Sequence, residues 1–223
     1  MMLQINRISL LSFLSATLTF ANAQDIKKVS TKQKIECYTL KETYYVLKSD
    51  TAIRQGSYTG RISFSSEKGQ YEQGKKSGIW EFYNGSKLIQ KYDFNTHTFI
   101  SNTKSTLIEK ITILDDSGNP IKELEPQNVY LGGDAKMNSI LVQCIRYPGA
   151  AVAKNIMGKV HISAILTKEG KLINAKTESA LGYGLEEEAM RVFRMFPPDW
   201  VPVVADGKTV PVKLEIAIGF TIS

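Results

Sequence analysis

Few residues of this sequence could perform acid–base, nucleophilic or metal chemistry. It contains only two histidines, His97 and His161, and two cysteines, Cys37 and Cys144. Neither histidine stands near a cysteine or a carboxylate pair at the spacing of a metal site. The sequence also lacks a nucleophile–base pair, a phosphate-binding loop and a metal-ligand motif. We therefore expect a protein that is not an enzyme and that needs no metal or small-molecule cofactor.

Two acidic clusters have a structural explanation. Asp115 and Asp116 open the segment Asp-Asp-Ser-Gly-Asn-Pro, which is typical of a turn whose Asp side chains accept hydrogen bonds from backbone N–H groups. The three glutamates at 186–188 stand at the start of a helix predicted over residues 185–196, where the helix dipole favours negative charge. Neither cluster is expected to be catalytic.

The N-terminus has the composition of a secretory signal peptide over residues 1–23. Arg7 is its only charge, and the apolar stretch at 8–20 is followed by Ala-Asn-Ala before Gln24. This stretch is shorter than the roughly 20 residues that a membrane-spanning helix needs. We predict cleavage before Gln24 and export, which makes nucleic acid an unexpected partner. An uncleaved membrane anchor is the alternative.

Composition and charge fit an exported globular protein. The chain has 223 residues, of which 43% are hydrophobic and 22% charged, with a formal net charge of +6. Because export makes nucleic acid an unexpected partner, the positive net charge favours binding to anionic lipid or to an anionic cell-wall polymer. Four lysines crowd residues 24–34, which we expect to be a solvated leader. Weak attraction to anionic envelope surfaces is the alternative role of this segment.

The two cysteines lie far apart in the sequence. Export permits a disulfide between Cys37 and Cys144. However, they fall in different predicted domains, and Cys144 lies on the apolar face of a predicted helix. Because a free cysteine is commonly a small core residue, we expect two buried free thiols, with the disulfide as the alternative.

Residues 36–100 predict an antiparallel meander of short strands. Glycines recur between segments of alternating apolar and polar residues, as in residues 79–83, where Trp80 and Phe82 share one face. The order Gly-x-Trp-x-x-Tyr at 78–83 resembles a MORN-type repeat. That resemblance implies stacked hairpins that serve as a platform or spacer. Residues 107–124 predict a strand, a turn and a short second strand that runs back along the first, and a domain boundary is expected near Pro126.

The remaining residues predict an α+β domain. An apolar stripe from Met137 to Ile145 indicates a helix, and Pro148 suits the first turn of a second short helix. A hairpin follows over 159–178, then the helix at 185–196 and a long strand at 210–222. Because no later strand can pair with this terminal strand, we expect its outer edge to be free. A free edge either invites aggregation or serves as a docking site.

Several short elements of this region, in order, resemble the TonB C-terminal domain family. They are Gly132-Gly133, Arg146-Tyr147-Pro148, Ala151, Gly158-Lys159-Val160, Glu169-Gly170, residues 185–189, Trp200-Val201-Pro202, Gly207-Lys208 and residues 212–220.

The resemblance implies docking of the TonB box of an outer-membrane transporter by β-strand addition to the terminal strand. The partner-binding residues carried over are Tyr147, Pro148, Val210, Val212, Leu214, Ile216 and Ile218.

The sequence departs from an energy-transducing TonB in two respects. It has only 7 prolines and no Pro-rich spacer, and no N-terminal membrane helix is predicted.

Three hypotheses about the function follow. The first is a periplasmic adaptor that docks a transporter or another envelope protein, and the second is a transducer anchored by an uncleaved N-terminus. The third is an envelope scaffold that binds cell wall or itself, for which a homodimer would be the sign.

The expected organisation has three parts, in the periplasm of a Gram-negative bacterium. A signal peptide covers 1–23, a MORN-like antiparallel β region covers 24–128, and a TonB-like domain covers 129–223. The fold class is α+β. The second domain is expected to place two or three helices on an antiparallel three-stranded sheet.

Overall fold

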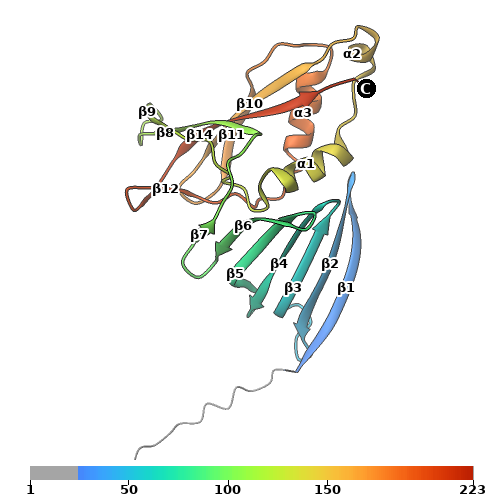
Figure 1. Cartoon of the computed structure of the whole chain (residues 1–223), viewed down its shortest axis with the longest axis vertical. Coiled ribbons are helices and arrows are strands. Elements are labelled where there is room, and N and C mark those ends of the chain that lie inside the picture. Colours follow the sequence, from blue (N-terminus) through green and yellow to red (C-terminus); the bar gives the residue numbers. More distant parts are fainter. Residues whose placement is uncertain (1–24, 223) are drawn as a thin grey trace, which may run out of the picture.

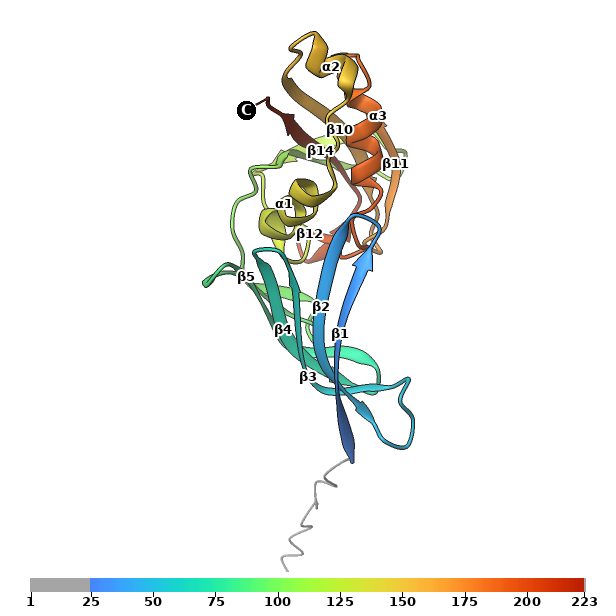
Figure 2. The ribbon, with the colours of Figure 1, turned by 90° about the vertical axis from the view of Figure 1, so that its right-hand side faces the viewer.

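The computed structural model describes residues 25–222, which form two large antiparallel sheets with helix α1 between them, and a separate two-stranded sheet (Figures 1 and 2). The predicted signal peptide and its cleavage site lie outside the described residues. The larger sheet is a meander in which each strand pairs with the next along the chain. Its strands are β1 (Ile26–Ile35), β2 (Tyr38–Leu47), β3 (Arg54–Ile62), β4 (Ser65–Glu72), β5 (Lys75–Asn84), β6 (Lys87–Asp93) and β7 (Thr98–Ser101).

The alternation seen in the sequence sets the two faces of this sheet. Trp80 and Phe82 are fully buried on its inner face, where they pack in a cluster with Tyr58 and Tyr92. The predicted antiparallel meander is thus present, while its resemblance to MORN repeats stays a prediction. The basic segment at 24–34 is not a leader, because residues 26–35 form β1 and pair in unbroken register with β2. Backbone pairing needs no apolar side chains, and lysines are common on edge strands.

Gly69 is required by close packing against Trp80. A Cβ atom on Gly69 would overlap the indole ring, although the backbone conformation there suits any residue. We expect Gly69→Ala to lower the free energy of unfolding by about 1–3 kcal/mol through overpacking, measured by urea denaturation. Gly149→Ala is the control, because a Cβ there meets nothing within 4 Å. An equal effect of both variants would contradict this explanation.

The second sheet has five strands rather than the predicted three. Their order is β11-β10-β14-β8-β9, so that β8 and β9, expected in the first domain, extend the sheet of the second. The boundary expected at residue 128 therefore lies before β8. The strands are β8 (Ile108–Leu114), β9 (Pro120–Leu124), β10 (Gly158–Leu166), β11 (Leu172–Thr177) and β14 (Val212–Phe220).

Helices cover this sheet and connect it to the first. The helices are α1 (Gly133–Cys144), α2 (Gly149–Ala153) and α3 (Leu185–Phe193), and a small hairpin joins β12 (Val203–Ala205) to β13 (Lys208–Val210). Helix α1 rests on one end of the inner face of the meander, where the Ser65 N–H donates to Ser139 Oγ at 3.1 Å. Tyr38 and Ile62 of the meander belong to the same apolar core as the five-stranded sheet. The end of the meander next to α1 therefore shares a core with the five-stranded sheet, while Trp80 and Phe82 belong to a separate cluster.

Cys37 and Cys144 form a disulfide, so the expectation of two free thiols is wrong. Cys37 lies in the turn between β1 and β2, and Cys144 is the last residue of α1. Burial of Cys144 on the apolar face of α1 was correctly expected. Because α1 packs on the meander, that face also meets the β1–β2 turn, which brings the two sulfurs together.

Candidate functional site

Strand β14 occupies the middle of its sheet, with β10 on one side and β8 on the other. The predicted docking residues Val212, Leu214, Ile216 and Ile218 are buried in the core. Val210 belongs instead to β13, where it pairs with Val203. The expectation of a free edge along 210–218 is therefore wrong over most of its length. The apolar residues Ile108, Ile111 and Ile113 explain the difference, since β8 buries them by joining the sheet.

The pairing of β8 with β14 ends before β14 does. The Ala217 N–H donates to the Leu107 carbonyl at 2.8 Å, and the register with β10 continues to Phe220. Backbone groups alternate sides along a strand, so Gly219 turns its N–H and C=O to the same side as Ala217, beyond the reach of β8. Gly219 is exposed. A short stretch of β14 edge is thus open.

Asp134 of α1 explains why the chain leaves β14 at this point. Its carboxylate accepts hydrogen bonds from Ser105 Oγ at 2.6 Å and from Thr106 Oγ1 at 2.8 Å. These contacts draw the residues before β8 toward the start of α1. The segment that would otherwise continue β8 is therefore held away from Gly219.

A cleft of about 520 Å³ lies beside the open end of β14. Tyr147 lines it, and its ring stands at 5.6 Å and 89° from the ring of Phe220. Val142 of α1 reaches into solvent at this cleft with 74% of its surface exposed, although it is apolar. The other lining residues are Thr106, Leu107, Asn138, Leu141, Ile145, Lys159, Ala217, Gly219, Phe220 and Thr221.

Tyr147 and Pro148 also have structural roles. The Tyr147 hydroxyl donates to the Ile156 carbonyl at 2.6 Å and so closes the turn around α2. Pro148 is the N-cap residue of that helix, in an extended conformation. Of the predicted docking residues, the structure places only Tyr147 in the wall of the cleft. Sequence reasoning missed Val142 and Gly219. An apolar residue off the buried stripe of α1 was the available signal for Val142.

A second cleft, of about 370 Å³, lies between α1 and the meander and contains a buried ion cluster. Lys136 Nζ lies 2.7 Å from Asp199 Oδ2 and 3.1 Å from Glu67 Oε2. Lys76 Nζ approaches the other Asp199 oxygen at 3.7 Å. The cluster links the meander to α1 and to the segment after α3.

The pKa values in this cluster follow from opposed effects. Burial by itself would lower the pKa of Lys136, but attraction to Glu67 and Asp199 outweighs it and raises that pKa well above its ordinary value. Burial would raise the pKa of Asp199, but Lys136 and Lys76 lower it below its ordinary value. All these groups are held as ion pairs, so we assign the cluster a structural role. A lysine on the apolar stripe of α1 was the sequence signal for it.

Comparison with known families gives a match in the second part of the chain. Residues 144–222 match the family described as Gram-negative bacterial TonB protein C-terminal. This part of the chain is therefore similar to TonB C-terminal domains. Comparisons with curated proteins and with solved structures give no match. The TonB match begins at the last residue of α1, so β8 and β9 precede the matched region and yet complete its sheet.

A TonB C-terminal domain indicates a protein of the Gram-negative envelope. Within residues 25–222, no helix is long and apolar enough to cross a membrane. The same residues hold no group of three or more His, Cys, Asp or Glu side chains that could bind a metal ion.

Proposed function

We propose that this chain is a periplasmic TonB-like adaptor that docks an extended segment of an outer-membrane transporter at the open end of β14. The observation that carries the proposal is the termination of the β8–β14 ladder at Ala217, which leaves Gly219 exposed beside a cleft. A partner strand that continues the line of β8 would pair with Gly219. This is strand addition at a sheet edge, the mode that the TonB resemblance implies.

The walls of the cleft supply the specificity. Val142, Ile145 and Tyr147 form an apolar surface next to the open backbone. In strand addition, alternate side chains of the added strand enter such pockets while the main chain supplies hydrogen bonds. We therefore expect a partner segment with an apolar side chain at the position that faces Val142. The exposure of Val142 is then explained by its contact with the partner.

A surface substitution tests this proposal. The probes are peptides of about ten residues from the periplasmic N-terminal segments of outer-membrane transporters of the same organism, with binding measured by fluorescence anisotropy. We expect Val142→Asp to weaken binding at least tenfold, because it places a charge against the apolar partner side chain. Val152→Asp is the matched control, since Val152 is an exposed valine on α2 and 48% accessible. It should leave binding unchanged.

A crosslink between β8 and β14 distinguishes the open end from the rest of the strand. Val212 and Ile113 face each other in the ladder, so cysteines at both positions can lock β8 in place. Peptide binding should survive this lock. Loss of binding would mean that the partner displaces β8, which overturns the proposed location. Failure of every peptide to bind the native protein would overturn the proposed function itself.

A further inference from the structure

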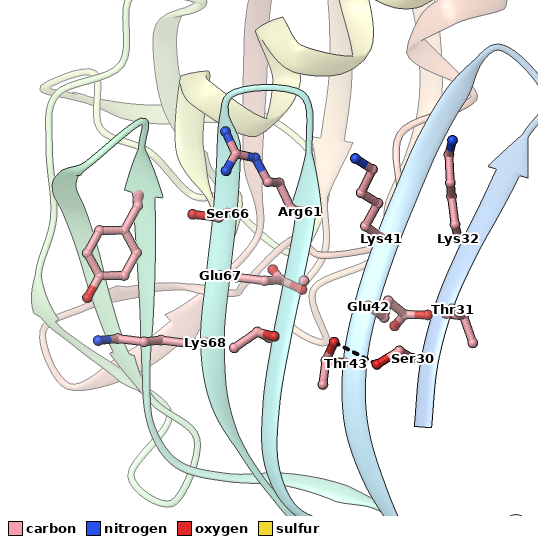
Figure 3. Close-up of a pocket in the computed structure, with 13 residues that line it drawn as sticks. Ser30, Thr31, Lys32, Lys41, Glu42, Thr43, Arg61, Ser66, Glu67 and Lys68 are labelled. Carbon is pink, nitrogen blue, oxygen red and sulfur yellow. Dashed lines mark hydrogen bonds between the residues drawn. The ribbon is translucent and has the colours of Figure 1, made fainter. Parts of the chain in front are cut away.

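The outer face of the meander, turned away from α1, carries cations in cross-strand register. Lys32 of β1 pairs with Lys41 of β2, which pairs with Arg61 of β3. Three positive side chains thus stand side by side on neighbouring strands, about 4.8 Å apart in the pairing direction. Figure 3 shows all three extending toward the same end of the strands.

This row is costly to the fold, because like charges directly opposite each other destabilise a sheet. No carboxylate of residues 25–222 lies within ion-pair distance of these three side chains; Arg61 only donates from Nε to the Ser63 carbonyl at 2.8 Å. Elsewhere on this face, by contrast, Glu81 lies between Lys68 and Lys91, at 2.9 and 2.8 Å. The sheet can therefore neutralise its cations, and the row lacks this compensation.

A row of hydroxyl groups runs beside the cations. Ser30, Thr43 and Thr59 are also in cross-strand register, and the Ser30 and Thr43 hydroxyls lie 3.2 Å apart. Both rows line one depression of about 410 Å³ (Figure 3). Glu42 and Glu67 also line it.

Both of these carboxylates are already engaged. Glu42 accepts from Tyr58 and Arg54, at 3.0 and 3.2 Å, and Glu67 pairs with Lys136. They leave the three cations of the row without a partner.

We propose that the outer face of the meander binds an acidic polysaccharide, independently of the docking cleft at β14. The cations Lys32, Lys41 and Arg61 pair with its carboxylates, and the hydroxyls of Ser30, Thr43 and Thr59 hydrogen-bond to its sugar hydroxyls. The partner is a chain rather than a bilayer surface, because the charged row lines a depression whose other residues, apart from Gly60, all carry a charge or a hydroxyl group. Hydroxyl groups in register complement a polyol better than a lipid headgroup layer.

A charge-matched pair of variants tests this site. The probe is oligogalacturonate, a polyuronic acid, with neutral dextran as the uncharged control, and binding is measured by isothermal titration calorimetry. We expect Lys32→Thr/Lys41→Thr/Arg61→Thr to weaken oligogalacturonate binding at least tenfold. Binding to the native protein should also weaken as salt rises. The control Lys154→Thr/Lys171→Thr/Lys208→Thr removes the same charge from exposed positions of the other domain and should bind as the native protein does.

Stability separates binding from folding. Because removal of the row relieves like-charge repulsion, the first triple variant should unfold at an equal or higher urea concentration than the native protein. Three outcomes would overturn the proposal. They are equal losses of binding in both triple variants, no binding of oligogalacturonate by the native protein, and binding of phosphatidylglycerol vesicles without binding of oligogalacturonate.

Discussion

Replacing both cysteines, as in Cys37→Ser/Cys144→Ser, should lower the free energy of unfolding by about 4–5 kcal/mol. The disulfide closes a loop with a sequence separation of 107 residues. In the chain-entropy description, a crosslink across a loop of roughly 100 residues restricts the unfolded chain by about 4.7 kcal/mol. The bond also ties the β1–β2 turn to the end of α1, where the two sheets meet. Urea denaturation of the oxidised native protein and of the variant measures the difference.

Chemical reduction provides the control for this prediction. Native protein unfolded in excess dithiothreitol should match the double serine variant under the same conditions, because both lack the crosslink. Adding the reductant to the variant should change nothing. If the oxidised native protein and the variant unfolded at the same urea concentration, the disulfide would contribute no stability. The disulfide contributes this stability only if the protein is exported to an oxidising compartment, where the bond can form.

Replacing the buried lysine, as in Lys136→Met, should cost about 3–5 kcal/mol of stability. The change leaves Glu67 and Asp199 facing a neutral side chain at the junction of the sheets. Removal of one partner from a buried ion pair is more costly than the pair is stabilising, because an uncompensated buried charge remains. The Lys136 side chain is only 8% exposed and those of Glu67 and Asp199 only 12% and 22%, so water replaces the lost partner incompletely. Urea denaturation at neutral pH measures the loss.

An exposed ion pair supplies the matched control. Lys104 and Glu125 form a salt bridge with 81% and 85% of their side chains exposed. Lys104→Met should therefore change the free energy of unfolding by less than about 1 kcal/mol. A second variant, Lys136→Met/Glu67→Gln/Asp199→Asn, removes the stranded charges and should recover part of the loss. Equal effects of Lys136→Met and Lys104→Met would contradict the role of burial.

The same cluster predicts how stability responds to acid. Because Lys136 and Lys76 hold the pKa of Asp199 below its ordinary value despite burial, the folded protein binds this proton less readily than the unfolded chain does. The stabilisation is thus fully present above the ordinary pKa of aspartate and is lost as pH falls through the lower value of the folded state. The Lys136→Met variant, which lacks the main attraction, should lose less stability over that acidic range than the native protein.

Local patterns predicted most of the individual elements. Alternation at 79–83 placed Trp80 and Phe82 on one buried face, and spacing from Met137 onward predicted α1. The helix expected at 185–196 is present as α3, over Leu185–Phe193. These elements depend on the periods of 2 and 3.6 residues, which are visible within a short window of sequence. The resemblance to the TonB C-terminal domain is supported by the family match over residues 144–222.

The pairing of distant segments was not visible in such windows. Strand β1 was not predicted, because its sequence is charged and poor in apolar residues. It is held at the edge of the sheet by backbone hydrogen bonds, which form whatever the side chains are. A strand was expected at residues 107–114. The pattern of apolar residues there does not indicate which strand it pairs with, and its partner β14 lies far along the sequence. That pairing closed most of the predicted docking edge and left open only the end beside Tyr147.

The sequence by itself determined the kinds of elements, their buried faces and the similarity of residues 144–222 to TonB C-terminal domains. Only the tertiary structure decided which edges stay open, that Cys37 meets Cys144, and that Lys136 is enclosed between Glu67 and Asp199. The physical reason is the range of the interactions. Helix and strand periodicity is a property of neighbouring residues, whereas edges, crosslinks and buried ion pairs exist only once the core that the two sheets share brings distant segments together.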